Sequence, residues 1–379
     1  MQKANYKNEV AKREFFSYLR NSEGFSDDSV DSFEAAICYW EDFNKSVDFS
    51  SFDEKEATNF KNWLKTKNRK GSETNISLSY CYDTLRRLRK FFDWLSKQPS
   101  YKSKINPNHI GFLNLSKKEA RVATQNRTRK VPSFEEVRQV LENIEGKTEV
   151  EKRDRALISF ILLTGARISA AISLPMKSFD RTTLTVDQNP AYDVKTKFSK
   201  RITTVLFPLP DEMPMTYFLE WFNYLEKERH FAAHDPIFPA AKLERSDESI
   251  SFSNSEKVEP LFWSDATSAR KIFEKRFKQA GVHYYHPHTL RHLIVGQFIK
   301  TRLTEEEKKA ISQNLGHENV GTTFGSYGYG QIAEDRQIDI VRSIKLSSPD
   351  SQKAINTMSD DEMKRLAKYL GDEIAGRGK

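Results

Sequence analysis

The stretch His286-Pro287-His288-Thr289-Leu290-Arg291-His292 decides how the rest of this 379-residue chain is interpreted. Its proline predicts the start of a helix, because proline brings a preset φ and has no amide hydrogen to lose. On that helix His288 and Arg291 are three residues apart, so they share one face. A guanidinium presents a planar fork of donors to phosphate oxygens, and an imidazole can donate to the same oxygens. The pair is therefore suited to a phosphate group.

Further polar groups follow this stretch. We expect a polar break at residues 304–308, and the segment Asn314-Leu315-Gly316-His317 comes next. Tyr327 lies ten residues beyond His317, in Thr-Thr-Phe-Gly-Ser-Tyr-Gly. A phenol can be a covalent nucleophile. Two imidazoles, a guanidinium and a phenol together indicate phosphodiester chemistry.

These motifs resemble the C-terminal signature of the tyrosine recombinases, the family of phage integrases, transposon recombinases and chromosome-dimer resolvases. The upstream segment Thr164-Gly165-Ala166-Arg167-Ile168-Ser169 is similar to the motif that carries the family's other arginine. The resemblance spans roughly residues 25–345 and is strongest in the C-terminal two thirds. It implies a mostly α fold with a small antiparallel β-sheet in the catalytic domain. It also implies a two-domain clamp, in which a helical core-binding domain joins a tyrosine-recombinase catalytic domain.

The resemblance also implies a catalytic set, made up of Arg167, Lys197, His288, Arg291, His317 and Tyr327. The tyrosine would attack the scissile phosphate and leave a 3′-phosphotyrosyl link. The arginines and histidines would hold the phosphate oxygens, and the lysine would protonate the leaving 5′-oxygen. The implied reaction needs no metal, no ATP and no cofactor.

This sequence leaves alternatives open for two residues and departs from the family at two points. Lys195 is the second candidate for the acid, and Tyr329 is the fallback nucleophile. The family more often has nine residues from the histidine to the tyrosine, and it usually places an acid where this chain has Ala170. Glycines around Tyr327 predict a mobile loop there.

Composition bounds the class of protein and its partners. Apolar residues make up 37% of the chain and aromatic residues 12%, so the chain is not of the disordered class. The net charge of +8 favours a polyanionic partner. No apolar run has the length of a membrane span, and residues 1–7 hold no signal core. Cys38 and Cys81 are expected as reduced, buried thiols, and the protein as cytoplasmic and associated with the bacterial nucleoid.

The expected domain organisation has five parts. They are an N-terminal extension (1–24), a helical core-binding domain (25–115), a basic, helix-poor linker (116–132), a catalytic domain (133–345) and a C-terminal tail with an exchange helix (346–379). Within the second part we expect helices capped by Ser26, from about Asp53, and over 78–97.

Two basic segments are candidates for binding the DNA backbone, with a solvated surface as the alternative for each. One is a face of the helix over 78–97, and the other is the linker. Their residues are Arg86, Arg87, Arg89, Lys90, Lys117, Lys118, Arg121, Arg127, Arg129 and Lys130.

In the catalytic domain, Ser133 and Glu136 predict a capping box. The apolar residues 156–163 predict a buried helix, and helices are also expected over 211–229 and 264–280. Alternation predicts short strands at 183–186, 192–197 and 202–207, and the polar residues 240–258 predict a surface insertion.

The tail carries a second capping box, from Ser359 to Glu362, followed by a narrow apolar stripe. Such a helix must dock somewhere, on its own catalytic domain or on a neighbouring subunit. The resemblance implies the second, in a homotetramer on two DNA duplexes whose subunits are monomers or weak oligomers when free.

The favoured function is a site-specific DNA recombinase, an integrase or transposase of a mobile element. The alternatives are a chromosome or plasmid dimer resolvase, a type IB topoisomerase-like enzyme, and a non-enzymatic DNA-binding module. His283, His286, His288 and His292 also raise the possibility of a metal site. The glutamate of His-Glu-x-x-His is absent, however, and Arg291 would lie beside the cation, so we expect no metal.

Overall fold

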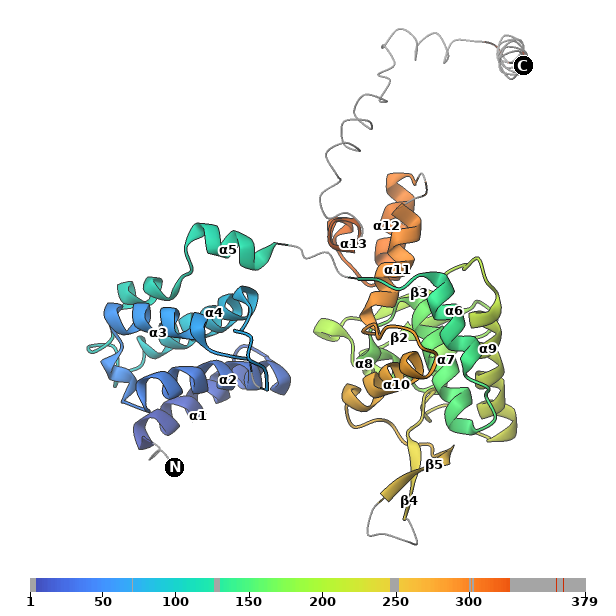
Figure 1. The fold of residues 1–379 in the computed structure, drawn as a ribbon, viewed down its shortest axis with the longest axis horizontal. Helices are drawn as coiled ribbons and strands as arrows, with labels where there is room; N and C mark the ends of the chain where they lie inside the picture. Colours follow the sequence, from blue (N-terminus) through green and yellow to red (C-terminus); the bar gives the residue numbers. More distant parts are fainter. Residues whose placement is uncertain are drawn as a thin grey trace. The chain divides into compact units, whose positions relative to one another are not determined.

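The computed structural model describes residues 5–69, 71–125, 130–245, 252–299, 301 and 303–327, together with Ser359 and Lys364. The chain divides into two compact units, Met1–Arg127 and Thr128–Lys379, here called the N-terminal unit and the C-terminal unit (Figure 1). Each unit has its own buried apolar core. The expected fold class, mostly helical with a small antiparallel sheet, is confirmed.

The named elements in the described part of the N-terminal unit are all helices or helical turns, with an isolated β-bridge between Asn68 and Asn75 besides. Its helices are α1 (Tyr6–Asn21), α2 (Asp27–Asn44), α3 (Glu54–Thr66), α4 (Leu78–Leu95) and α5 (Lys117–Thr124), with 3-10 turns η1 (Phe49–Ser51) and η2 (Pro107–Leu113). The helix starts predicted at Ser26 and Asp53 are confirmed, and the Asp53 side chain accepts from the amide of Glu56. Trp40 centres the core, with its ring 5.0 Å from Phe60 and 4.9 Å from Phe92.

Three expectations for this unit need correction. Helix α1 buries Phe15 and Leu19 in the same core as α2–α4, so the first residues are not a separate extension. The stretch expected as a helix-poor linker contains α5, which has a capping box between Ser116 and Glu119 and buries Ala123. Cys38 is exposed, because it lies on the face of α2 that does not pack, whereas Cys81 is buried as expected.

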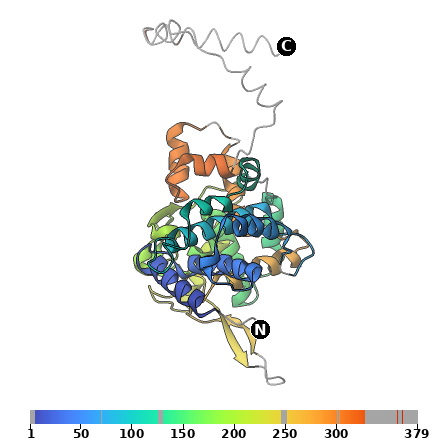
Figure 2. The ribbon, with the colours of Figure 1, turned by 90° about the vertical axis from the view of Figure 1, so that its left-hand side faces the viewer.

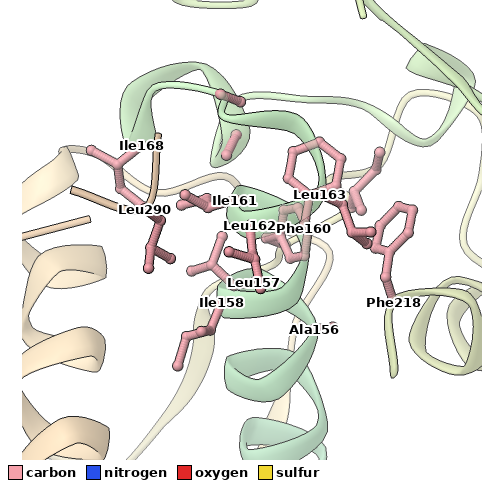
Figure 3. Close-up of a cluster of buried hydrophobic side chains, with 14 of the residues drawn as sticks. Ala156, Leu157, Ile158, Phe160, Ile161, Leu162, Leu163, Ile168, Phe218 and Leu290 are labelled. Carbon is pink, nitrogen blue, oxygen red and sulfur yellow. The ribbon is translucent and has the colours of Figure 1, made fainter. Parts of the chain in front are cut away.

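The C-terminal unit is built around one helix that is buried on all sides. Its helices are α6 (Phe134–Asn143), α7 (Glu149–Thr164), α8 (Ile168–Ala171), α9 (Met213–Asn223), α10 (Ala266–Gln279), α11 (His288–Ile299), α12 (Glu305–Asn314) and α13 (Val320–Tyr327). The 3-10 turns are η3 (Met176–Ser178), η4 (Pro190–Tyr192) and η5 (Lys197–Ser199), and η6 (Tyr224–Glu228) is a π-helix. Helix α7 contacts α6, α8, α9 and α11, and its apolar residues fill the centre of the core (Figure 3). The buried helix predicted over 156–163 and the capping box at Ser133 are therefore confirmed.

A three-stranded antiparallel sheet lies beside this core. Its order is β1 (Phe179–Asp180), β2 (Thr185–Gln188) and β3 (Ile202–Val205). The strand predicted at 192–197 is wrong: Pro190 and a left-handed Asp193 (φ 62°) turn the chain into η4, and β2 pairs directly with β3. The residues 189–201 thus form a long connection between paired strands.

The polar segment 240–258 forms a hairpin, β4 (Ala241–Arg245) with β5 (Phe252–Val258). The hairpin projects from the C-terminal unit in both views (Figures 1 and 2). Its last residue is anchored, because the amide of Val258 donates to Glu149 Oε2 at 2.8 Å.

Two expectations near the end of the described chain are wrong. The residues expected as a polar break start α12, where Thr304 and Glu307 form a capping box. The residues before Tyr327, expected as a loop, form α13. The tail from 346 to 379, with its proposed exchange helix, lies outside the described residues apart from Ser359 and Lys364. In the part of the chain that is described, no helix is long and apolar enough to cross a membrane.

Candidate active site

The end of α7 places Arg167. The helix stops at Gly165, whose left-handed conformation (φ 61°) a residue with a side chain adopts at a cost. The Thr164 hydroxyl donates to the carbonyl of Phe160 at 2.7 Å and accepts from the amide of Ala166 at 3.1 Å. These bonds fix the turn. Arg167 follows the turn and is the N-cap residue of α8.

Arg291 joins three motifs that are far apart in the sequence. It comes from α11, is only 2% exposed, and donates from Nη1 to the carbonyl of Gly165 at 2.8 Å. Its Nη2 donates to the carbonyl of Leu315 at 2.5 Å. The Gly165 carbonyl stands at the C-terminal end of α7, where the helix dipole favours a cation. The guanidinium is therefore held by backbone oxygens rather than by a carboxylate in these bonds.

His317 lies against this guanidinium. Its Nε2 is 2.6 Å from Arg291 Nη2, and its Nδ1 is 2.8 Å from the hydroxyl of Thr323. Burial, together with the charges of Arg291, Arg167, Lys197 and Lys200, lowers the pKa of His317 to about 3. The imidazole is therefore neutral at pH 7, in surroundings positive enough to attract an anion.

Arg167 is half-buried, and no carboxylate among the described residues pairs with its guanidinium. The position of the family's acid is occupied by Ala170, which is 2% exposed. A half-buried guanidinium without a carboxylate is suited to a bound anion, because burying an unpaired charge is costly.

The three lysines of the β2–β3 connection differ in their surroundings. Lys197 is exposed on η5, with Nζ 4.8 Å from the ring centre of Phe198, and its charge acts on His317. Lys200 pairs with Glu318 at 3.2 Å. Lys195 Nζ is 3.5 Å from the carbonyl of Ser264.

A cavity of about 590 Å³ opens beside these groups, between β3 and α12. Its walls include Lys200, Arg201 and His317. The site is therefore open to solvent at His317, where Lys200 pairs with Glu318 and Arg201 with Asp187.

His288 begins α11 and is partly exposed, with its ring 5.4 Å from that of His292. His286 Nδ1 accepts from the amide of His288 at 3.2 Å, which binds it to the start of the helix. In the described part of the chain, no three His, Cys, Asp or Glu side chains are grouped as metal ligands.

Tyr327 is the last residue of α13, a helix that contacts α11 and α12. Its side chain is not among those that the structure describes, and the alternate Tyr329 lies outside the described residues. The helix itself is tied to the site by Thr323, which is fully buried.

Two positioning groups were missed from the sequence. Asn314 binds the backbone of Val205 with both ends of its side-chain amide, which fixes the end of α12 to β3. Ser312 accepts a hydrogen bond from Thr323 at 3.0 Å. A signal for them was present in the sequence. The capping-box pattern from Thr304 to Glu307 predicts the start of a helix, and that helix places Ser312 and Asn314 in its last turn.

The candidate DNA-binding residues fall into three groups. Lys90 pairs with Glu23 at 2.8 Å, and Arg86 lies 3.8 Å from Asp83. Helix α5 carries three exposed cations, Lys117, Lys118 and Arg121, and the described structure gives none of them an acidic partner. The same is true of Arg87, Arg89 and Lys130. Arg127 and Arg129 lie outside the described residues.

Comparison with known proteins gives one family. Residues 130–329 match the model of the phage integrase family. The chain is similar to the tyrosine recombinase XerC of Lactobacillus delbrueckii subsp. bulgaricus, with 24% identity over 320 residues that cover 82% of this chain and 91% of that protein. It shares the fold of a lambda integrase fragment bound to a core site, with a TM-score of 0.57, 14% identity, and coverage of 86% of this chain and 99% of the other. A Tn1549 transposon integrase in complex with transposon right end DNA also shares the fold, with a TM-score of 0.57 and 15% identity over 88% of this chain and 99% of that one.

Proposed function

The chain belongs to the phage integrase family and is a tyrosine recombinase, an enzyme of site-specific DNA recombination, and we propose that it cuts and rejoins DNA through Tyr327. One observation carries the assignment of the site. It is the buried contact of Arg291 with neutral His317, near which the side chains of Arg167 and Lys197 add positive charge. The guanidinium and ammonium donors of this group are suited to one phosphate, whereas His317, expected to donate to the phosphate as well, has its ring nitrogens on Arg291 and Thr323.

In the proposed reaction the Tyr327 hydroxyl attacks the scissile phosphorus, and the bond to the 5′-oxygen breaks. The product is a 3′-phosphotyrosyl link with a free 5′-hydroxyl. Negative charge on the phosphate oxygens is greatest in the transition state, where Arg167, Arg291 and His288 stabilise it. Fixed donors of this kind contribute about 3 kcal/mol each.

Lys197 is the proposed general acid, which gives its proton to the leaving 5′-oxygen. In the second half-reaction a 5′-hydroxyl from a partner strand attacks the phosphotyrosine and releases Tyr327. The bond energy is kept in the phosphotyrosyl link, so the proposed exchange needs no ATP.

A nicked substrate that traps the covalent intermediate tests the nucleophile. Tyr327→Phe is expected to bind the DNA and to form no adduct, whereas Tyr329→Phe is expected to form it at the normal rate. If Tyr329→Phe alone abolishes the adduct, the nucleophile is Tyr329.

We further propose that the recombination serves integration and excision of a mobile element. The structure of the Tn1549 integrase, which shares the fold, was determined in complex with transposon right end DNA. The XerC relative supports the second candidate, a dimer resolvase. Covalent adducts trapped in cells can be isolated and their DNA sequenced. Reads that map to the ends of an element support integration, and reads confined to one chromosomal site support resolution.

DNA is the proposed partner of the basic residues of the N-terminal unit. The exposed cations of α5 provide the observation, because nothing acidic in the described structure neutralises Lys117, Lys118 or Arg121. Replacing all three with alanine is expected to lower the log–log salt slope of binding by about 0.9 for each lost phosphate contact. An unchanged slope would place the DNA contacts elsewhere.

We propose that four subunits assemble on two duplexes and that the tail links them in a ring, as heterologous contacts can. Deleting residues 350–379 is expected to leave a folded protein that binds a half-site but does not form the tetramer. Light scattering of the DNA complex, beside a recombination assay, measures this. A truncated protein that forms tetramers and recombines at the full rate would overturn the proposal.

A further inference from the structure

A buried chain of hydrogen bonds leads from Arg291 to the helix that carries Tyr327. It runs from Arg291 Nη2 to His317 Nε2 (2.6 Å), from His317 Nδ1 to Thr323 Oγ1 (2.8 Å), and from Thr323 to Ser312 Oγ (3.0 Å). Thr323 and Ser312 are fully buried, and His317 is 6% exposed. The chain of hydrogen bonds therefore connects α11, the turn that follows α12, α13, and α12 itself.

The direction of each bond follows from the donors that are present. A guanidinium has no acceptor, so Nε2 of His317 must accept from Arg291. A neutral imidazole with an accepting Nε2 carries its proton on Nδ1, and that proton points to the Thr323 hydroxyl. The hydroxyl then has its own proton left for Ser312, in agreement with the third bond of the chain.

The opposite tautomer would conflict with this arrangement. A proton on Nε2 would face the N–H groups of Arg291 at hydrogen-bond distance, with two donors and no acceptor. Which ring nitrogen of a histidine is protonated depends on the hydrogen bond made by the other nitrogen. At His317 that partner is Thr323.

We propose that Thr323 is a positioning residue, which holds His317 as the Nδ1–H tautomer so that its Nε2 can orient Arg291. Thr323 lies on α13, four residues before the end of that helix at Tyr327. The orientation of the phosphate-binding guanidinium thus depends on α13 being docked. This inference rests on the proposed function for its catalytic meaning, but the tautomer itself does not.

The first test is independent of activity. Nitrogen-15 NMR of the His317 ring reports which nitrogen carries the proton. In the wild-type protein we expect a protonated Nδ1 and an unprotonated Nε2. Thr323→Val, which keeps the shape and removes the hydroxyl, leaves the Nδ1–H without its acceptor, so the Nδ1 resonance is expected to shift. Thr323→Ser is expected to keep the wild-type pattern.

The second test measures cleavage of the nicked substrate. Thr323→Val is expected to lower the cleavage rate about ten- to a hundredfold, because a buried donor loses its partner, with little change in DNA affinity. Thr323→Ser is expected to restore most of the rate. Thr322→Val is a matched control, since Thr322 is the exposed neighbour on the same helix and its loss should leave the His317 signals unchanged.

If Thr323→Val does not fold, Ser312→Ala tests the same chain from its other end. The Thr323 hydroxyl would then lack its acceptor and accept less strongly from Nδ1–H, so the Nδ1–H resonance is expected to move. An unmoved resonance counts against the inference. So does a wild-type ring protonated on Nε2, or an equal loss of rate in the valine and serine variants.

The tautomer of His317 and the proposed function can be tested separately. If the tautomer behaves as expected but the wild-type protein forms no adduct with DNA, the proposed function is wrong and the positioning of His317 stands. If adducts form and the ring is protonated on Nε2, the proposed function stands and the inference is overturned.

Discussion

The side-chain amide of Asn314 pairs with both backbone groups of Val205. Its Nδ2 donates to the carbonyl at 3.0 Å, and its Oδ1 accepts from the amide at 2.7 Å. Val205 ends β3, which has β2 on one side only, so Asn314 takes the place of a missing strand. Asn314 also lies three residues before His317. Its backbone carbonyl accepts a hydrogen bond from the Thr204 hydroxyl at 2.8 Å.

Asn314→Asp is expected to lower the free energy of unfolding by about 1 kcal/mol or more, because a carboxylate cannot donate to the Val205 carbonyl. Asn314→Ala should cost about as much as a lost pair of neutral bonds, again about 1 kcal/mol. Urea unfolding measures both. Gln313→Ala is the control, since Gln313 is the exposed neighbour. Equal stability of the Asp variant and the wild type would show that this pairing contributes nothing.

Alanine at Gly165, in the turn after α7, and alanine at Gly296, in α11, are expected to have opposite effects on the free energy of unfolding. A Cβ at Gly165 would meet Leu315 Cδ2 at 2.7 Å, and the residue has a φ of +61°, so Gly165→Ala is strained twice. We expect a loss of about 1–2 kcal/mol in unfolding free energy and reduced cleavage, because the Gly165 carbonyl holds Arg291.

Gly296 is the matched control for that substitution. It lies inside α11, where an added Cβ would meet nothing within 4 Å. Gly296→Ala is expected to stabilise the protein by about 0.5–1 kcal/mol, because alanine loses less backbone entropy in a helix. A destabilising alanine at Gly296, or a harmless one at Gly165, would contradict this account of the turn.

Much of the site could be predicted because it is made of motifs. The segments around Arg167, Arg291 and His317 were expected to act together, and the structure links them through the carbonyls of Gly165 and Leu315. The apolar run of α7 was decisive, since a helix buried on all sides has to be central to its unit.

Other features depend on contacts that a local pattern does not contain. The alternation at 192–197 predicts a strand, but Pro190 and the left-handed Asp193 break it before any pairing. The charged start of α12 is interpreted as a break, because the first five residues after Thr304 are all acidic or basic whichever structure they adopt. The bond between Thr323 and His317 joins residues whose approach requires the packing of α13 on α12.

The general acid can be identified with a substrate that has sulfur in place of the bridging 5′-oxygen. A thiolate leaves without protonation, so this substrate should rescue a variant that lacks the acid. Lys197→Ala is expected to be rescued, and Arg291→Ala is not, because its loss affects charge on the other oxygens. Rescue of Lys195→Ala alone would move the role to Lys195.

The last prediction concerns pH and the His317 side chain. Its pKa is lowered to about 3 in the folded protein, first by burial and then by the charges of Arg291, Arg167, Lys197 and Lys200. In the unfolded chain a histidine titrates near 6.5. Between these values the unfolded chain binds the additional proton, so the free energy of unfolding rises with pH. The contribution of His317 is therefore complete above about pH 6.5 and is lost progressively as the pH falls towards 3.

Other groups also titrate on the acid side: hydrogen bonds from Lys65 and Ser116 lower the pKa of Glu119 to about 2. The comparison must therefore be between the wild type and His317→Gln, which removes the titration and keeps an oxygen that can accept from Arg291. Urea unfolding from pH 7 to pH 4 should show wild-type stability falling more steeply than that of the glutamine variant. His283→Gln, at an exposed histidine of the same unit, controls for the loss of a histidine as such. If the difference between wild type and His317→Gln stays constant across this range, His317 is not held neutral by its surroundings.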